Sequence, residues 1–386
     1  MVLINSHPIQ YFAPLYQRMS NAADFHFEIW YCSDESITGK LDKGFGQEVK
    51  WNIPLLDGYD YLFLKNSSWK PSIHKGFWGV FNPSLISKLY KKKKSILVVS
   101  GWAFSTYVMA IFFGKIAGHT VCLRVETPLN QELKKNKIIT IAKHLWLRFL
   151  FIFIDKFLFI GNQNRLFYER LGVRQSDLIF TPYAVDNDRF RSVYLQHDKS
   201  SVKMQLQLSA EKKIILFSGQ YIFKKRPLDL LAAFAACDNA DAHLVFVGDG
   251  ELRPEMESFI LEHSLSGKVI LTGFVNQQEM PLYYKAADVF VMCSGMGETW
   301  GLSVNEAMNF GLPVIVSDTC GCAYDLVENG VNGAVFETGN INQLAGLIDE
   351  YLLMDDVSMK KIEKAALNKI DQYSYDKIID GLKKLV

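Results

Sequence analysis

Short runs of apolar residues alternate with longer mixed segments along most of the chain. In the first half these runs lie at residues 2–5, 25–31, 96–100, 119–125 and 156–161. In the second half they lie at residues 214–218, 243–247, 269–272, 287–292 and 313–316. Short apolar runs bounded by glycine, proline or polar residues are typical of buried parallel strands. Because helix-like segments separate them, we expect an α/β fold with doubly wound parallel sheets.

The length of the chain predicts two domains. A chain of 386 residues exceeds what one hydrophobic core usually serves. A polar, charged run at residues 191–211 separates the two series of strands and is interpreted as a linker. We therefore expect one Rossmann-like domain at residues 1–190 and a second at residues 212–370, followed by a helix at residues 371–386.

Composition excludes several classes of protein. Hydrophobic residues make up 49% of the chain and charged residues 22%, which excludes a disordered or collagen-like protein. The formal net charge of +1 gives no global field that would attract nucleic acid, so no nucleic-acid partner is expected. The six cysteines lack the spacing of a zinc site or a disulfide framework, which favours a reducing, cytoplasmic location.

The chain begins directly in a strand-like run, so we expect no signal peptide. The most apolar stretch, residues 145–160, contains Arg148, Asp155 and Lys156, and we expect no transmembrane helix.

A helix expected at residues 131–155 mixes lysines with large apolar and aromatic side chains. Such a helix can lie in a membrane interface. Together with the four lysines at residues 91–94, it would then hold the protein peripherally against anionic lipids at the inner face of a membrane. The alternative is a helix that covers the sheet, with its apolar stripe buried and its lysines solvated.

The stretch at residues 294–316 carries the strongest candidate site. Glu298 lies in a glycine-punctuated loop, and Glu306 lies in a helix expected at about residues 301–310. A charged residue is uncommon among small and apolar neighbours, so Glu306 indicates a functional role. The amides at the helix start can hold a phosphate, and each carboxylate can accept hydrogen bonds from sugar hydroxyls. The stretch therefore predicts a ligand site at the carboxyl edge of a parallel sheet.

The residues from Glu298 to Glu306, followed by Ala-Met-x-x-Gly-Leu-Pro-Val, resemble the E-x7-E signature of retaining glycosyltransferases of family 4. The resemblance covers residues 214–347 and is weaker in the N-terminal half. It implies the GT-B fold, in which two facing Rossmann-like domains enclose an interdomain cleft. It also implies that the N-terminal domain binds the acceptor, that the C-terminal domain binds a nucleotide-sugar, and that the last helix crosses back to the N-terminal domain.

The loop after the strand at residues 214–218 is a second candidate. Its candidate residues are Gly219, Gln220, Lys224, Lys225 and Arg226. A strand, a glycine, a basic cluster and a helix in succession are typical of phosphate binding, although solvated surface cations are the alternative. In the family an arginine follows the glycine and a lysine lies five residues later. Lys225 matches this lysine, whereas Gln220 replaces the arginine and adds no charge.

The resemblance implies further donor-binding residues and a role for each charged group. The further donor-binding candidates are Gly248, Gly273, Phe274, Trp300, Gly301 and Leu302. Glu306 would bind the ribose hydroxyls of a UDP- or GDP-sugar, and Glu298 would bind hydroxyls of the donor sugar. Lys225 would neutralise the leaving diphosphate, so neither a metal nor a cofactor is expected.

The N-terminal half contributes candidates at the ends of its strands. His7 and Gln10 follow the first strand, and Arg124 and Glu126 end a later one. All four are candidates for contact with the acceptor in the cleft, and His7 is also a catalytic candidate. The alternatives are that His7 caps the following helix and that Arg124 and Glu126 form an ion pair.

The resulting hypothesis is a retaining, metal-independent, hexosyl-type glycosyltransferase. Its acceptor would be a saccharide or a lipid-linked saccharide in cell-surface polysaccharide synthesis. The alternative is a catalytically silent GT-B protein that binds nucleotide-sugars, which Gln220 and the Ser-His-Pro turn after the first strand favour.

Overall fold

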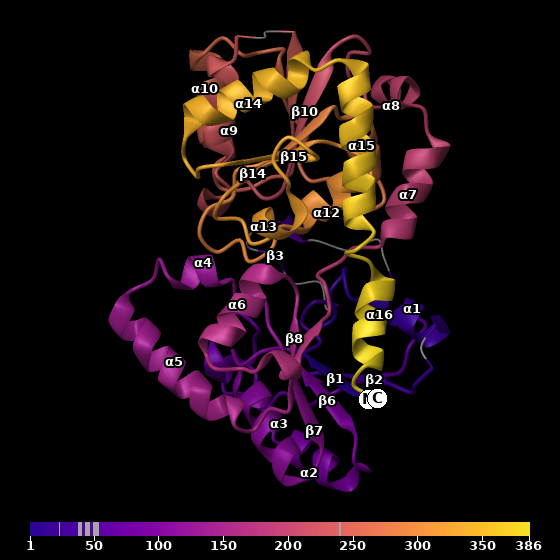
Figure 1. Cartoon of the computed structure of the whole chain (residues 1–386), viewed down its shortest axis with the longest axis vertical. Helices are drawn as coiled ribbons and strands as arrows, with labels where there is room; N and C mark the ends of the chain where they lie inside the picture. The colour runs from indigo at the N-terminus through magenta and orange to yellow at the C-terminus, as the bar shows by residue number, and fades with distance from the viewer. Residues whose placement is uncertain (23, 38–40, 43–46, 49–53, 239–240) are drawn as a thin grey trace. The chain divides into compact units, whose positions relative to one another are not determined.

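The computed structural model describes the chain from Met1 to Val386, except residues 23, 38–40, 43–46, 49–53 and 239–240. The chain divides into two compact units (Figure 1). The first unit comprises Met1–Lys40, Pro54–Tyr183 and Tyr375–Val386, and the second comprises Leu41–Ile53 and Ala184–Ser374.

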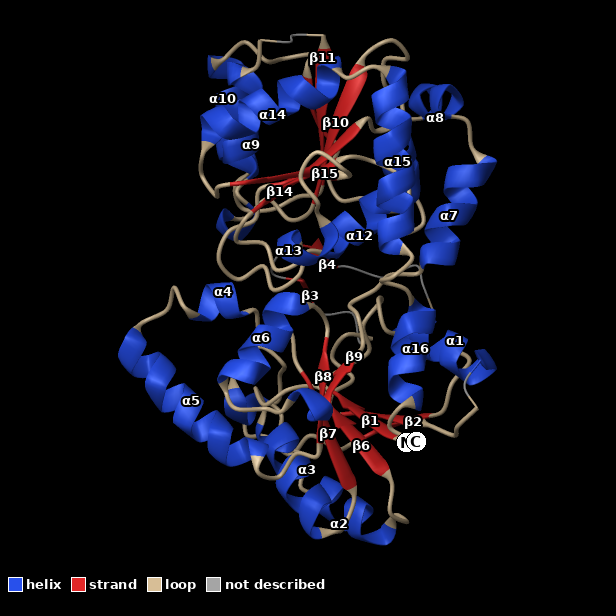
Figure 2. Ribbon diagram, in the orientation of Figure 1, coloured by secondary structure: helices blue, strands red, loops and turns tan. Residues whose placement is uncertain are grey.

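The described residues of the first unit form a seven-stranded parallel sheet in the order β5-β2-β1-β6-β7-β8-β9. Its strands are β1 (Val2–Asn5), β2 (Glu28–Tyr31), β5 (Tyr61–Phe63), β6 (Ile96–Val99), β7 (Thr120–Arg124), β8 (Lys156–Phe159) and β9 (Leu178–Phe180). Its helices are α1 (Ala13–Ala22), α2 (Ser84–Lys91), α3 (Ser105–Ile116), α4 (Leu129–Glu132), α5 (Lys137–Phe151), α6 (Asn162–Arg170) and α16 (Tyr375–Lys383), with short 3-10 turns η1 (Phe77–Gly79) and η2 (Gln175–Asp177). Figure 2 shows these helices around the strands.

The described residues of the second unit form a six-stranded parallel sheet in the order β12-β11-β10-β13-β14-β15. Its strands are β10 (Lys213–Ser218), β11 (Ala242–Val247), β12 (Val269–Leu271), β13 (Val289–Met292), β14 (Val314–Ser317) and β15 (Gly333–Phe336). Its helices are α7 (Asn187–Gln196), α8 (Lys199–Gln205), α9 (Pro227–Ala236), α10 (Arg253–Glu262), α11 (Met280–Ala286), α12 (Leu302–Met308), α13 (Ala323–Leu326), α14 (Ile341–Leu353) and α15 (Asp356–Ile370), with the 3-10 turn η3 (Phe223–Lys225). A separate two-stranded antiparallel sheet pairs β3 (Leu41–Asp42) with β4 (Gln47–Glu48).

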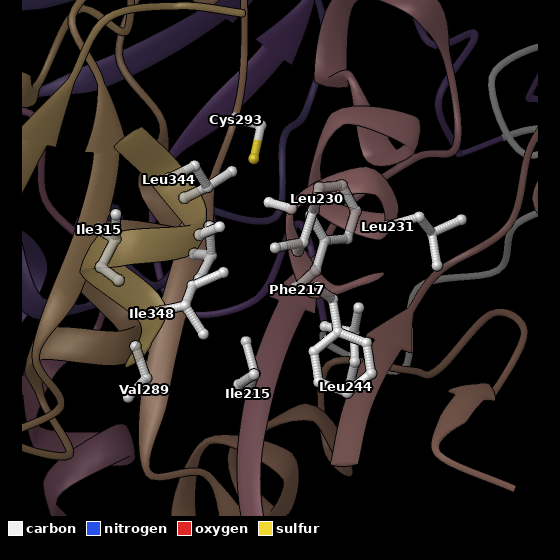
Figure 3. Close-up of a cluster of buried hydrophobic side chains, with 14 of the residues drawn as sticks. Ile215, Phe217, Leu230, Leu231, Leu244, Val289, Cys293, Ile315, Leu344 and Ile348 are labelled. Atoms are coloured by element: carbon white, nitrogen blue, oxygen red, sulfur yellow. The ribbon is translucent and has the colours of Figure 1, made fainter. Parts of the chain in front are cut away.

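The core of the second unit shows why its strands are continuous apolar runs. Ile215 and Phe217 of β10 are buried on one face of the sheet (Figure 3). The same cluster includes Leu230 of α9 and Leu344 of α14, so these helices cover that face. Parallel strands are covered by helices on both faces, and alternating polar residues would therefore be buried without partners. The predicted doubly wound α/β fold is confirmed.

The segment expected as a linker has a different structure. Residues 191–211 contain most of α7 and all of α8, and both helices pack against α11. Two of the charges that made this segment look like a linker are paired: the Nζ atoms of Lys199 and Lys203 lie 2.7 Å and 3.6 Å from the carboxylate of Asp288. The apolar anchor is Phe190, which is buried and contacts the ring of Tyr284.

The helix expected at residues 131–155 is divided in two. Asn136 interrupts it and caps α5 by accepting a hydrogen bond from the amide of Ile138 at 3.0 Å. The interpretation of a buried covering helix holds for the C-terminal part of α5, which buries Leu147, Leu150 and Phe151 in the core of the first unit. Its other large apolar side chains are mostly exposed. No helix among the described residues is both long enough and apolar enough to cross a membrane.

The last helix packs with the first unit. The hydroxyl of Tyr375 donates to the carbonyl of Tyr11 at 2.9 Å, and the guanidinium of Arg18 donates to both oxygens of Asp376. These contacts join α16 to α1, so the chain returns to its first unit after completing the second.

Candidate functional site

The candidate donor site lies in the loops that follow β10 and β13. These strands are neighbours in the second sheet, and because they are parallel their loops leave at the same edge. The two loops are joined by a hydrogen bond from the amide of Gly295 to the carbonyl of Lys224 at 2.8 Å. The tertiary structure therefore brings together the two candidate groups that lie about seventy residues apart in the sequence.

Glu298 and Lys225 form the centre of this site. The ammonium group of Lys225 contacts Oε2 of Glu298, and Nζ of Lys224 lies 3.9 Å from the same oxygen. The side chains of Lys225 and Glu298 are only 15% and 11% exposed. Burial alone would raise the pKa of Glu298, but the charges of Lys225 and Lys224 outweigh it and hold this pKa below its ordinary value. The carboxylate is therefore ionised, and it positions the lysines that sequence analysis assigned to phosphate.

Glu306 lies deeper, on α12. It is 2% exposed, and the hydroxyl of Tyr284 donates to its Oε2 at 2.7 Å. Tyr284 belongs to α11, so its contact with Glu306 depends on how α11 packs against α12. Sequence analysis missed Tyr284, because no local pattern indicates which side chain a distant helix places beside a carboxylate.

The turn into α12 is constrained by its packing. Gly301 has φ +106°, and a Cβ atom there would lie 2.7 Å from Sδ of Met292 and 2.9 Å from Sγ of Cys320. Trp300 is buried, and its indole Nε1 donates to Oδ1 of Asn305 at 2.8 Å. The indole therefore fixes the loop. The amides of Trp300, Gly301 and Leu302 stay candidates for ligand contact.

A third loop, after β14, supports the loop that carries Glu298. The amide of Gly321 donates to the carbonyl of Glu298 at 3.1 Å, and the amide of Cys322 donates to the carbonyl of Trp300 at 3.0 Å. A Cβ atom at Gly321 would lie 1.8 Å from the carbonyl oxygen of Thr299. Only glycine allows this close approach, so Gly321 holds the site loop in place.

The glycines after β11 and β12 pack against backbone. A Cβ atom at Gly248 would lie 2.0 Å from the carbonyl oxygen of Gly219, and the amide of Gly248 donates to the carbonyl of Gly273 at 3.0 Å. These contacts join the loops of β10, β11 and β12. Close packing of the loops is thus a reason for glycine at position 248, besides the predicted approach of a base or ribose. Phe274, next to Gly273, is half-buried.

The remaining residues of the basic loop differ from one another. Arg226 adopts a left-handed backbone conformation with φ +51°, and its Nε donates to Oδ2 of Asp229 at 2.6 Å. Its charge is therefore matched within the loop. Gln220 is half-buried, and its carbonyl accepts a hydrogen bond from the amide of Ile222. Lys225 and Lys224 are the cations that face Glu298.

The N-terminal candidates lie at the carboxyl edge of the first sheet. His7 follows β1, and its Nδ1 lies 2.8 Å from Oγ of Ser6. Burial, with a smaller contribution from the charge of His74, lowers the pKa of His7 to about 4. His7 is therefore neutral at pH 7.

Arg124 connects this turn to the loop after β7. Its guanidinium lies 5.1 Å from the ring centroids of both Phe12 and Tyr183, and its Nη1 lies 3.7 Å from Oε1 of Glu126. The ion-pair interpretation of Arg124 and Glu126 is thus confirmed. Buried Nη2 of Arg124 and buried Oε1 of Gln10 make no hydrogen bond to any residue that the structure describes.

No group of three histidine, cysteine, aspartate or glutamate residues in the described part of the chain could hold a metal ion. The Asp-x-Asp triplet at residues 186–188 begins α7, where Asp186 caps the helix by accepting a hydrogen bond from the amide of Arg189 at 3.1 Å. A reaction without metal stays a prediction.

Comparison with known proteins agrees with this geometry. Residues 198–369 match the family model described as glycosyl transferases group 1. An uncharacterized glycosyltransferase of Methanocaldococcus jannaschii is 29% identical over 182 residues, which are 47% of this chain and 46% of that protein. The N,N'-diacetylbacillosaminyl-diphospho-undecaprenol alpha-1,3-N-acetylgalactosaminyltransferase of Campylobacter jejuni is 24% identical over 259 residues, 67% of this chain and 66% of that protein. The matches thus span from about half to two thirds of these relatives.

Among solved structures, HepE of Anabaena in complex with UDP aligns with 100% of this chain and 98% of its own, with a TM-score of 0.75 and 16% identity. At that identity the likeness concerns the fold. Two Rossmann-like units with parallel sheets, and a second unit that matches glycosyl transferases group 1, show that this chain resembles the GT-B glycosyltransferases.

Proposed function

We propose that this chain is a retaining, metal-independent glycosyltransferase. It transfers a sugar from a UDP- or GDP-sugar to a saccharide or lipid-linked saccharide in cell-surface polysaccharide synthesis. The observation that carries the proposal is the buried contact of Lys225 with Glu298, with Lys224 beside it, in the segment that matches glycosyl transferases group 1. A lysine pair held by a carboxylate at the carboxyl edge of a parallel sheet suits a diphosphate joined to a sugar.

The reaction breaks the bond between C1 of the sugar and the diphosphate oxygen, and it forms a bond from C1 to the acceptor oxygen on the same face. The proton of the acceptor hydroxyl passes to the leaving diphosphate. Lys225 and Lys224 stabilise the negative charge that grows on this diphosphate. Glu298 accepts hydrogen bonds from hydroxyls of the donor sugar and holds the two lysines in position.

Glu306 would accept hydrogen bonds from the ribose hydroxyls of the nucleotide. The hydroxyl of Tyr284 fixes the orientation of this carboxylate before the nucleotide binds. His7, which is neutral at pH 7, would contact the acceptor or the transferred sugar through its ring nitrogens.

Calorimetric titration with UDP, GDP and ADP tests the donor part of the proposal. Wild type is expected to bind one of them, with UDP tested first because HepE, which shares the fold, binds UDP. Glu306→Ala should lose on the order of 1.5–3 kcal/mol, which is about tenfold to a hundredfold in affinity. Glu255→Ala, at an exposed position of α10 in the same unit, is the control and should bind normally. If none of the three binds, or if Glu306→Ala binds as wild type does, the site has been misassigned.

The alternative of a catalytically silent protein is tested by transfer itself. Gln220 removes one cation that the family resemblance implies, which is the observation that favours this alternative. Mass spectrometry of acceptor oligosaccharides after incubation with the bound nucleotide's sugars would detect a mass increase of one sugar. Any such product eliminates the silent alternative, whereas nucleotide binding without a product or free sugar favours it.

We further propose that the first unit docks on an anionic membrane through the α5 surface, the stripe Ile138, Ile141, Leu145, Phe149 and Ile152. These residues recur every three or four positions, and Ile138, Leu145 and Ile152 are 78%, 62% and 72% exposed. Leaving so much apolar area in water is costly. Residues 133–152 contain no acidic residue, and the exposed bases Lys134, Lys137 and Arg148 complement anionic lipid.

The orientation of α5 is fixed by ion pairs with one buried carboxylate. Glu132 is 1% exposed and binds the ammonium groups of Lys135 and Lys143, which join α4 to α5. Nζ of Lys143 also lies 5.8 Å from the ring of Trp102 and 5.6 Å from the ring of Phe167. These contacts hold α5, the magenta helix in Figure 1, in place, while the side chains of its apolar stripe stay exposed.

Flotation with vesicles of phosphatidylcholine and phosphatidylglycerol tests this surface. Wild type should float at low salt, and the double variant Ile138→Asp, Leu145→Asp should lose about a hundredfold or more in partitioning, because each side chain contributes roughly 1.5–3 kcal/mol when buried. Leu261→Asp removes a similarly exposed side chain, 71%, from α10 and should float as wild type does. No flotation of wild type at low salt, or a stable dimer in solution that buries α5, would refute membrane docking.

A further inference from the structure

The segment between β5 and α2 exposes three large aromatic side chains. Trp69 is 95% exposed, Trp78 is 65% exposed, and Phe77 is 41% exposed. Their exposed rings contribute little to the core, so folding does not explain them. They form a surface of the first unit that is separate in sequence from both α5 and the donor-site loops.

These aromatic residues are carried by a firmly hydrogen-bonded loop. The side-chain amide of Asn66 donates to the carbonyl of Gly79 at 3.0 Å, and its Oδ1 accepts from the amides of Ser68 and Phe81. The hydroxyl of Ser68 donates to the carbonyl of Trp78 at 2.6 Å. The backbone that carries Trp69 and Trp78 is therefore held in place, which lowers the entropy lost when a ligand binds.

The loop lines an open concavity of about 490 Å³, a size typical of small-molecule sites. Its lining includes Ser67, Trp69, Lys70, Lys75, Trp78 and Phe81. The rings of Trp78 and Phe81 meet edge to face at 6.0 Å. Residues 61–83 contain no aspartate or glutamate, so the charged groups that this segment contributes are cations. Apolar ring faces, hydroxyls and cations therefore meet in one concave site.

The position of this loop ties it to the carboxyl edge of the first sheet. Glu35, in the loop after β2, accepts hydrogen bonds from Oγ of Ser72 at 3.0 Å and from the amide of Ile73 at 2.9 Å. The charges of His74 and Glu35 both act on His7, in the turn after β1. Because β5, β2 and β1 are successive neighbours in the sheet, their three loops meet at the edge where α/β proteins bind ligands.

We propose that this cavity, which we call the Trp69 pocket, binds an anionic saccharide. As the acceptor subsite of the first unit, it rests on the glycosyltransferase function proposed above. The flat C–H face of a pyranose ring packs on an indole ring, and a carboxylate or phosphate on the same sugar meets Lys70 and Lys75. A lipid surface fits less well, because the site is concave and combines hydroxyls with the rings.

Calorimetric titration with the acidic tetrasaccharide tetragalacturonic acid and the neutral tetrasaccharide maltotetraose tests the pocket. Wild type should bind the acid at least tenfold more tightly than the neutral sugar, and this preference should fall as salt is added. Trp69→Ala should lower affinity for the acid at least tenfold. Lys70→Gln with Lys75→Gln should remove the preference and leave weak binding of both sugars. Trp146→Ala removes a half-exposed tryptophan of the same unit outside the pocket and should bind as wild type does.

The outcomes separate this inference from the proposed function. If Trp69→Ala binds nucleotide normally but loses the acidic sugar, the pocket is a saccharide site of the first unit. If wild type binds nucleotide but neither tetrasaccharide up to millimolar concentration, the pocket assignment is overturned while the transferase proposal stands. If wild type binds the acid and no nucleotide, the transferase proposal fails and the pocket remains. Equal affinity for both sugars, or flotation of wild type that Trp69→Ala abolishes, would overturn the anionic-saccharide assignment.

Discussion

The buried ion pair between Lys225 and Glu298 should contribute measurably to the stability of the second unit. In Lys225→Met the carboxylate of Glu298 stays buried and keeps only Lys224, which lies 3.9 Å away and is 37% exposed and therefore partly screened by solvent. We expect a loss of about 3 kcal/mol in the free energy of unfolding, the lower end for removing one partner of a buried pair. Glu298→Gln keeps the shape of the side chain but leaves Lys225 without its anion, and should cost about 2 kcal/mol.

The double variant Lys225→Met, Glu298→Gln carries neither charge, so it should cost about 2 kcal/mol, less than the roughly 5 kcal/mol sum of the single variants. The coupling energy is then about 3 kcal/mol. Hydrogen exchange followed by mass spectrometry at increasing urea should be read on peptides from β10 and β13, because these central strands report the second unit by itself. A coupling energy below about 0.5 kcal/mol would show that the two side chains do not interact in solution, and the described geometry of the site would be refuted.

Three further changes test other parts of the structure. Burial lowers the pKa of His7 to about 4 from an ordinary 6.5, so on acidification this histidine is protonated in the unfolded chain before it is protonated in the folded protein. The free energy of unfolding is therefore full above about pH 6.5 and falls toward pH 4. In urea titrations His7→Gln should reduce this loss by on the order of 2–3 kcal/mol. Gly321→Ala, whose Cβ would lie 1.8 Å from a backbone carbonyl, should lower the melting temperature of the second unit by several degrees, whereas Gly346→Ala, with open space around it, should not lower it. Tyr284→Phe should cost about 1.5–3 kcal/mol of stability, because it removes the hydroxyl that donates to buried Glu306, and normal stability in calorimetry would contradict that contact.

Much of the fold could be predicted from the sequence, because parallel strands buried on both faces occur in it as continuous apolar runs. The strands β5, β9 and β15 were not predicted. Leu178–Phe180 has only three residues, and Gly333–Phe336 begins with a glycine that packs against the carbonyl of Val314. Short or glycine-containing strands resemble loops, and only their pairing with neighbours in the sheet defines them.

The candidate site was predicted in part for a similar reason. Glu298 and Lys225 were identified from their own local patterns, since each follows a buried strand and lies near a helix start. Their contact was not predicted, because it depends on β10 and β13 being neighbours in the sheet. Tyr284 carried no signal, as its role arises from the packing of α11 against α12.

The sequence by itself determined most of the strands and which loops carry charge, because periodicity and residue type act over a few neighbouring positions. The tertiary structure decided which groups meet and which surfaces stay uncovered. It paired Lys225 with Glu298, turned the expected linker into α7 and α8, and left the apolar stripe of α5 facing outward. An apolar helical stripe indicates that another surface covers it, but which surface does so depends on contacts between residues far apart in the chain.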